Sequence, residues 1–99
     1  MLFFRAELTD KIVIPVEESV QLESLRQAVV PPYLMLMPYI IVPDGIVVED
    51  QLALDEDGIH GCIYILRAER ALIGDIEIGF KDMQTQEITH SKQLRVIAI

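Results

Sequence analysis

The first residues whose types and spacing could do chemistry are Asp55, Asp57 and His60, which lie around Gly58. Carboxylates and an imidazole can bind a metal ion, and the glycine would permit a sharp bend between them. A calcium loop requires more oxygen ligands at regular spacing and a closing glutamate, which this stretch lacks. We therefore interpret these residues as a solvated acidic turn, and we predict no metal site and no cofactor.

A second candidate is the single cysteine, Cys62, which stands two residues from His60, with His90 further along the chain. A Cys–His pair can form a nucleophile, and residues two apart on a strand point to the same face. A catalytic cysteine needs a lowered pKa, which a helix amino-terminus or a neighbouring cation usually supplies. Cys62 instead stands in an apolar run beside Ile63, so we expect a small core residue there.

Two carboxylate pairs, Asp75–Glu77 and Glu49–Asp50, could perform acid–base chemistry. The first pair falls on the polar side of an amphipathic strand, where exposure to water accounts for it. The sequence contains no serine–histidine–aspartate signature, phosphate-binding glycine loop or dinucleotide fingerprint. We therefore predict that the protein is not an enzyme and has no catalytic or cofactor-binding residues.

The elements that must position these side chains read as β-strands along almost the whole chain, because apolar and polar residues alternate. The expected strand pieces are Leu2–Leu8, Ile12–Val16, Ile46–Asp50, Leu52–Leu54, Ile59–Ala68, Leu72–Lys81 and Leu94–Ala98. Ile59–Ala68 is apolar on both faces near its middle, so we expect it to be central. Turns are expected at Pro43–Gly45 and Asp55–Gly58. Glu17–Ala28 fits either a short strand or a two-turn helix, and both readings stay open.

Turns at short spacing without a long helix are typical of an all-β sandwich or barrel. We predict one domain over residues 1–99, an antiparallel immunoglobulin-like sandwich of seven or eight strands, with a small β-barrel as the alternative. The strand order resembles an immunoglobulin-like sandwich, and roughly the last forty residues resemble the closing strands of the chagasin-type cysteine protease inhibitors. The resemblance covers strand rhythm and implies a fold, not a function.

The inhibitors of that family carry three loop motifs: Asn-Pro-Thr-Thr-Gly, Gly-Gly and Arg-Pro-aromatic. None of the three occurs in this sequence. The first motif would fall at Gln27–Pro32, which reads QAVVPP.

The most apolar stretch runs from Ala28 to Pro43 and reads AVVPPYLMLMPYIIVP. It is shorter than the roughly 20 residues of a membrane helix, and its prolines disfavour helix, so we predict strands with Pro38 at a bulge or an edge. A strand that is apolar on both faces needs cover on both sides, within its own domain or from a partner. We favour a partner, because 52% hydrophobic residues is a high fraction for a small domain. The predicted function is a protein-interaction or assembly domain that forms a homo-oligomer through Tyr33, Leu34, Met35, Leu36, Met37, Tyr39, Ile40 and Ile41.

The net charge is −8, and no Lys or Arg occurs between Gln27 and Leu66. The acidic segment in this span contains Asp44, Glu49, Asp50, Asp55, Glu56 and Asp57. The lack of clustered cations argues against nucleic-acid binding, and anionic lipid would repel the chain, so membrane attachment ranks third. The second function hypothesis is an immunoglobulin-like inhibitor or decoy of an enzyme, acting through the acidic segment or through loops at one end. A single cysteine and no evident amino-terminal signal favour a cytoplasmic location.

Overall fold

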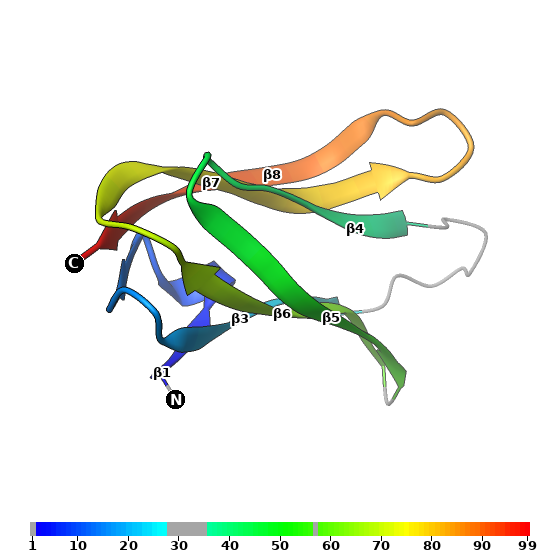
Figure 1. The fold of residues 1–99 in the computed structure, drawn as a ribbon. Coiled ribbons are helices and arrows are strands. Elements are labelled where there is room, and N and C mark those ends of the chain that lie inside the picture. The colour runs from blue at the N-terminus through cyan, green and yellow to red at the C-terminus, as the bar shows by residue number, and fades with distance from the viewer. Residues whose placement is uncertain (1, 28–35, 57) are drawn as a thin grey trace.

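The computed structural model describes residues 2–27, 36–56 and 58–99, which form two sheets packed face to face (Figure 1). The elements are β1 (Leu2–Arg5), the 3-10 helix η1 (Ala6–Leu8), β2 (Lys11–Ile14), β3 (Ser19–Gln27), β4 (Leu36–Ile41), β5 (Ile46–Glu56), β6 (Ile59–Ala68), β7 (Leu72–Asp82) and β8 (Ile88–Ala98). The first sheet has the strand order β1-β3-β6-β5 and the second has β2-β8-β7-β4. The predicted all-β sandwich is confirmed, and the barrel alternative is wrong for the described residues, which close no barrel.

Both sheets are mixed rather than purely antiparallel. Strand β1 pairs with β3, and β2 pairs with β8, in parallel, while the pairings β3–β6, β5–β6, β4–β7 and β7–β8 are antiparallel. The helix η1 carries the chain from β1 at the edge of the first sheet to β2 at the edge of the second. Each sheet thus gains an edge strand from the first fourteen residues.

The core lies between the sheets and is built from alternate residues of each strand. On β6, Cys62, Tyr64, Leu66 and Ala68 are at most 3% exposed, while the residues between them point outward and are partly exposed. The predicted central position of β6 is confirmed, since it lies between β3 and β5. The alternation predicted for β7 is also confirmed, with its apolar face buried.

The strand predicted over Leu2–Leu8 is wrong in its second half, where the chain forms η1. The side chain of Ala6 is 3% exposed, whereas that of Leu8 is 76% exposed. The ammonium group of Lys92 on β8 donates a hydrogen bond of 2.8 Å to the Ala6 carbonyl oxygen. This contact, between residues far apart in sequence, accompanies the change from β1 to η1, and period-two alternation does not reveal it.

The open reading of Glu17–Ala28 is resolved as strand over Ser19–Gln27. Val20 and Leu22 are fully buried, and Ser24 on the same face is 4% exposed, which is the period of a strand rather than a helix. Pairing with β1 on one side and β6 on the other satisfies the backbone of β3. Tertiary pairing therefore decides a segment whose local pattern is ambiguous.

Strand β5 is continuous where two strand pieces were expected, and it contains a β-bulge. The pairing with β6 shifts between Val48 and Asp50, which leaves Glu49 as an extra residue. Ile46 and Val48, which precede the shift, face the core. A regular strand would also turn Leu52 toward the core, but after the shift Leu52 faces outward and is 61% exposed. In the part of the chain that the structure describes, no helix is long or apolar enough to cross a membrane.

Candidate functional site

The β5–β6 and β7–β8 connections, the last residues of β3 and the first residues of β4 lie at one end of the sandwich, which we call the loop end (Figure 1). In the first sheet, β5 turns into β6, and Glu56 pairs with Ile59 beside the turn. In the second sheet, β7 turns into β8, and Leu36 at the start of β4 pairs with Asp82 at the end of β7. Strand β3 also ends here, and residues 28–35, which join it to β4 in the sequence, lie outside the described residues.

The imidazole of His60 joins the two sheets at the loop end. Its Nε2 lies 2.8 Å from the carbonyl oxygen of Leu36, and because a carbonyl only accepts, Nε2 carries the proton and donates. Its Nδ1 lies 3.8 Å from Oδ1 of Asp55, whose side chain is 82% exposed, so this second contact is weak. The His60–Leu36 hydrogen bond fixes the start of β4 against β6.

The ring of Phe80 packs four strands together directly beneath the loop end. It is 5% exposed, and the guanidinium carbon of Arg26 on β3 lies 5.5 Å from its centroid. The ring centroid of His60 on β6 lies 5.9 Å away, and that of His90 on β8 lies 6.2 Å away in an edge-on arrangement. Aromatic and cation–π contacts of this kind add to the burial energy of the ring. The connections therefore rise from a tightly packed base.

The β7–β8 connection is held in shape by Asp82. Its Oδ1 accepts hydrogen bonds from the backbone N–H groups of Gln84 at 2.8 Å and Thr85 at 3.1 Å, as in an Asx turn. The backbone of Gln86 adopts a positive φ of 64°, and its N–H donates to the Asp82 carbonyl at 2.8 Å. This ordered turn presents the side chain of Met83, which is 46% exposed.

The residues predicted to form an apolar interface divide between buried and exposed positions. Leu36 and Tyr39 are each 9% exposed, and Ile40 packs against the core, whereas Met37 and Ile41 are 38% and 58% exposed. A side chain packed inside its own chain is not available to a second copy. Among the described members, Met37 and Ile41 are exposed, and their role in an interface stays a prediction. The remaining members, Tyr33, Leu34 and Met35, lie outside the described residues.

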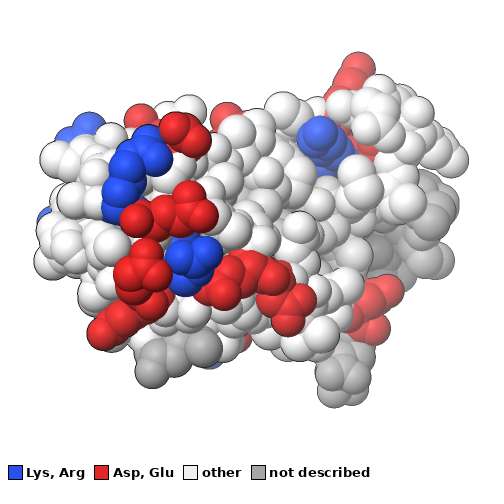
Figure 2. Space-filling view, in the orientation of Figure 1, with Lys and Arg blue, Asp and Glu red and all other residues white. Residues whose placement is uncertain are grey.

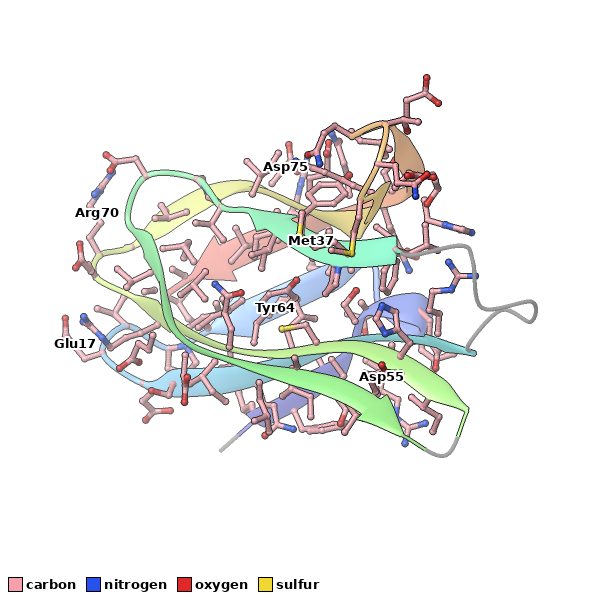
Figure 3. All side chains as sticks on the ribbon, turned by 90° about the vertical axis from the view of Figure 1, so that its right-hand side faces the viewer. Glu17, Met37, Asp55, Tyr64, Arg70 and Asp75 are labelled. Carbon is pink, nitrogen blue, oxygen red and sulfur yellow. The ribbon has the colours of Figure 1, made fainter. Side chains whose placement is uncertain are left out.

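Pro38 lies on an edge strand, as one of the two predictions for it stated, because β4 is the outermost strand of its sheet. A proline on a free edge removes a backbone donor and opposes the addition of another strand. Figure 3 looks onto the loop end and shows Met37 on β4 and Asp55 on β5, with Tyr64 between the sheets. Self-association through β4 remains a prediction, and Pro38 weighs against strand pairing as its mode.

Tyr39 lies across Gly79 on the outer face of the second sheet and binds Glu77. Its hydroxyl donates a hydrogen bond of 2.8 Å to Oε2 of Glu77, and the ammonium nitrogen of Lys81 lies 5.2 Å from the ring centroid. Burial, followed by the hydrogen bond to Glu77 and its negative charge, raises the pKa of Tyr39 to about 12. The Tyr39 phenol is therefore a structural group of this sheet.

The raised pKa of Tyr39 predicts a loss of stability in alkali. The unfolded phenol ionises near its ordinary pKa of 10.0, whereas the folded one holds its proton to about 12, so the free energy of unfolding falls as the pH rises across this interval. Tyr39→Phe should lower the free energy of unfolding by about 1 kcal/mol at pH 8. Between pH 10 and 11, the free energy of unfolding of this variant should fall less steeply with pH than that of the wild type. Urea unfolding at these pH values measures both effects. Burial also raises the pKa of Tyr64, which both proteins keep, so identical pH dependence would contradict the assignment to Tyr39.

The predicted acidic segment follows strand β5, so its members are spread along the length of the sandwich. Asp44 and Glu49 lie at the end away from the loops, whereas Asp55 lies at the loop end. Asp50 and Asp55 are separated by roughly 16 Å, at about 3.3 Å per residue of strand. Figure 2 shows most of the acidic side chains of this face on its left and centre, with a smaller number near the loop end on the right. Glu56 also belongs to the loop end, and Asp57 lies outside the described residues.

The acids at the far end are partly neutralised by nearby arginines. Nε of Arg67 lies 3.5 Å from Oε1 of Glu49, which also accepts a hydrogen bond of 2.7 Å from the hydroxyl of Ser19. Arg70 lies 3.0 Å from a carboxylate oxygen of Asp44. Part of the negative charge of the segment is therefore balanced within the chain, and a binding role for residues 44–57 stays a prediction.

The chemical candidates of the sequence have structural explanations. Cys62 is 3% exposed, and burial raises the pKa of its thiol, which opposes a nucleophilic role. Asp75 faces outward on β7, as expected for a solvated strand face. Across residues 2–27, 36–56 and 58–99, no three His, Cys, Asp or Glu side chains are grouped closely enough to hold a metal ion.

Comparison with known proteins identifies a solved structure with a similar fold. No family model matches the sequence, and no curated protein matches it. Among solved structures, the chain is similar to the cysteine protease inhibitor EhICP2 from Entamoeba histolytica, with a TM-score of 0.72. The similarity covers 99% of this chain and 94% of that chain at 12% sequence identity, so it establishes the fold alone. The fold class is an immunoglobulin-like sandwich with the architecture of this inhibitor, and the resemblance in strand order expected from the sequence is confirmed.

Proposed function

We propose that this protein is a non-catalytic inhibitor that binds a cysteine protease with its loop end. The observation that carries the proposal is that the β5–β6 and β7–β8 connections lie at the same end of a sandwich that shares the fold of EhICP2, a cysteine protease inhibitor. Of the sequence hypotheses, this corresponds to the inhibitor acting through its end loops. The partner is then a protein, an enzyme rather than a second copy of this chain.

The surface chemistry of the loop end supports a protein partner. Exposed apolar side chains lie at each described connection: Ile59 is 41% exposed beside the β5–β6 turn, and Met83 and Ile88 are 46% and 54% exposed on the β7–β8 connection. Methionine adapts its shape to a partner, and apolar side chains dominate the centres of protein interfaces. Because Asp82 already orders the β7–β8 turn, binding loses less conformational entropy there.

This chain must use other side chains than the chagasin-type inhibitors do. Their three loop motifs are absent from the sequence, so the proposal takes no contact residue from that family. Among the described residues, Met83 is the best candidate for a principal contact, because it stands at an ordered turn and its side chain is free of the core.

Inhibition of a papain-type cysteine protease tests the proposal. The purified chain should inhibit hydrolysis of a small fluorogenic peptide, and Met83→Asp should raise the inhibition constant at least tenfold, which is about 1.4 kcal/mol and within the range of an interface hot spot. The matched control is Ile73→Asp, because Ile73 is 72% exposed near the opposite end of β7. Its inhibition constant should match that of the wild type. A panel of such proteases that all remain fully active at micromolar concentrations of the chain would refute the proposal.

A further inference from the structure

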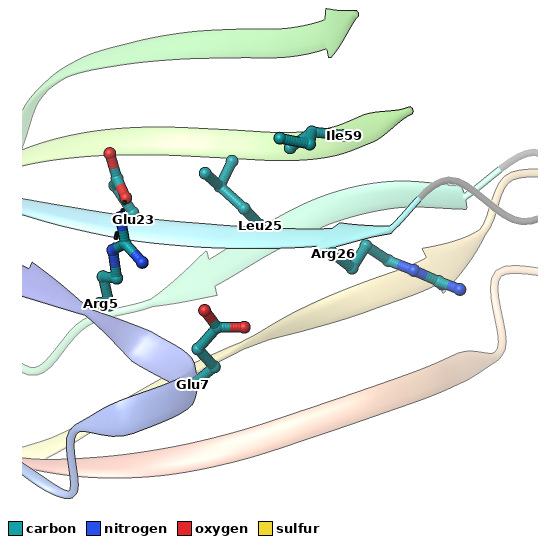
Figure 4. Close-up of a pocket in the computed structure, with 6 residues that line it drawn as sticks. All are labelled: Arg5, Glu7, Glu23, Leu25, Arg26 and Ile59. Carbon is teal, nitrogen blue, oxygen red and sulfur yellow. Dashed lines mark ion pairs between the residues drawn. The ribbon is translucent and has the colours of Figure 1, made fainter. Parts of the chain in front are cut away.

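A groove of about 230 Å³ opens on the outer side of the first sheet, next to the loop end (Figure 4). Its lining residues are Arg5, Glu7, Glu23, Leu25, Arg26 and Ile59. Leu25 lies near the end of β3, and Ile59 is the first residue of β6, directly after the β5–β6 turn. These two side chains form an apolar floor between the charged ones. Because the groove lies next to the loop end, a partner bound at the loop end would cover it.

The charges around this floor are not equally available. Nε of Arg5 lies 3.7 Å from Oε2 of Glu23, so these two largely compensate each other. Arg26 extends away from the floor, past the end of β3, and its guanidinium lies over Phe80 (Figure 4). The remaining charged side chain that lines the groove is the carboxylate of Glu7 on η1.

Glu7 has no cation within ion-pair distance among the described residues, and its side chain is exposed. The ammonium group of Lys92, which lines a second hollow next to Glu7, is engaged elsewhere: it lies 3.4 Å from Asp10 and donates to the Ala6 carbonyl oxygen. Glu7 thus presents an uncompensated negative charge at the side of an apolar floor.

We propose that this groove binds one lysine or arginine side chain of the partner enzyme, beside the loop-end contact. The hydrocarbon stem lies on Leu25 and Ile59, and the cationic head pairs with Glu7. A long basic side chain matches both features, since it carries an apolar stem and a terminal charge, and a charge-assisted hydrogen bond favours the pairing. The net charge of −8 attracts a basic partner surface at longer range. This inference rests on the proposed function, because it takes the loop end to be where the enzyme binds.

The first test measures inhibition by Glu7→Gln, which keeps the size of the side chain and removes its charge. The control is Glu18→Gln, because Glu18 is also exposed but lies in the turn before β3, at the other end of that strand. At low salt, Glu7→Gln should raise the inhibition constant for a papain-type protease about three- to tenfold, and the difference should shrink at high salt. Glu18→Gln should match the wild type at every salt concentration.

The second test needs no enzyme. Nα-acetyl-arginine methylamide, titrated into the isotope-labelled chain, should shift the amide resonances of Glu7, Leu25 and Ile59. Nα-acetyl-norleucine methylamide, which has an apolar stem and no charge, should not, and Glu7→Gln should abolish the response to the arginine compound.

The outcomes of the two tests separate the groove from the proposed function. If the wild type inhibits a protease and Glu7→Gln has the same inhibition constant, the groove inference is overturned and the proposed function stands. Selective shifts with the arginine compound but no inhibition of any protease support the groove and overturn the proposed function. Neither shifts nor inhibition overturns both.

Discussion

Gly79→Ala is expected to prevent folding, or to lower the free energy of unfolding by about 3 kcal/mol or more. Gly79 lies in the middle of the second sheet on β7, where a Cβ atom would overlap the carbonyl oxygen of His90 on β8. On another side it would come within 2.8 Å of Cε1 of Tyr39 on β4. Backbone and a packed ring both resist displacement, so the strain has no easy relief. Circular dichroism and urea unfolding of the purified variant measure the effect.

The matched control is Gly74→Ala on the same strand. A Cβ atom there would lie 3.1 Å from Cγ of Pro43, a side-chain atom that can shift by a few tenths of an ångström. The expected cost is below about 1.5 kcal/mol. Equal costs at the two positions would mean that loss of glycine from β7, rather than the close approach of His90 and Tyr39, causes the damage.

Phe80→Ala is the second substitution with a large expected effect, about 3–5 kcal/mol in the free energy of unfolding. The ring is 5% exposed and contacts Arg26, His60 and His90, so its removal leaves a cavity where four strands meet. The same loss should loosen the base of the loop end. We therefore expect weaker protease inhibition even at temperatures where the variant is still folded.

The control for Phe80→Ala is Phe3→Ala, because Phe3 on the edge strand β1 is 49% exposed. Its expected cost is below about 1 kcal/mol, with no change in inhibition. Urea unfolding and inhibition assays on both variants, run at the same temperature, distinguish the two roles. A stable Phe80→Ala variant with full inhibition would show that the ring supports neither the core nor the loop end.

The strands whose partners lie on both sides were predictable from the sequence. On β6 and β7 the apolar residues recur with period two because a packed sheet faces them along the whole strand. The alternation fails where a distant contact intervenes. Lys92 donates to the carbonyl oxygen of Ala6 where β1 gives way to η1, and the bulge at Glu49 changes the face on which Leu52 lies. Neither event leaves a local signal of its own.

The candidate site was predictable only in outline. Loops at one end of the sandwich were among the predicted binding surfaces, but the residues chosen were those of the apolar segment and the acidic segment. Composition drew attention to Leu36 and Tyr39, which the chain buries itself, and nearness in sequence joined acids that β5 separates. The hydrogen bond from His60 to Leu36 spans two sheets, so no spacing rule reveals it. The Asp82 turn had a usable signal, since an aspartate just before the polar residues 84–87 favours an Asx turn.

The bulge in β5 means that this strand carries one residue more than its neighbour β6 requires. Losing a single residue at the bulge would straighten the strand, and Asp50 and Leu52 would keep their present partners, Ile65 and Ile63. The side chains from Asp50 to the β5–β6 turn would therefore stay on the faces of the sheet where they lie now. The fold should therefore tolerate a natural or designed deletion of one residue at the bulge, because the register between β6 and the rest of β5 stays the same.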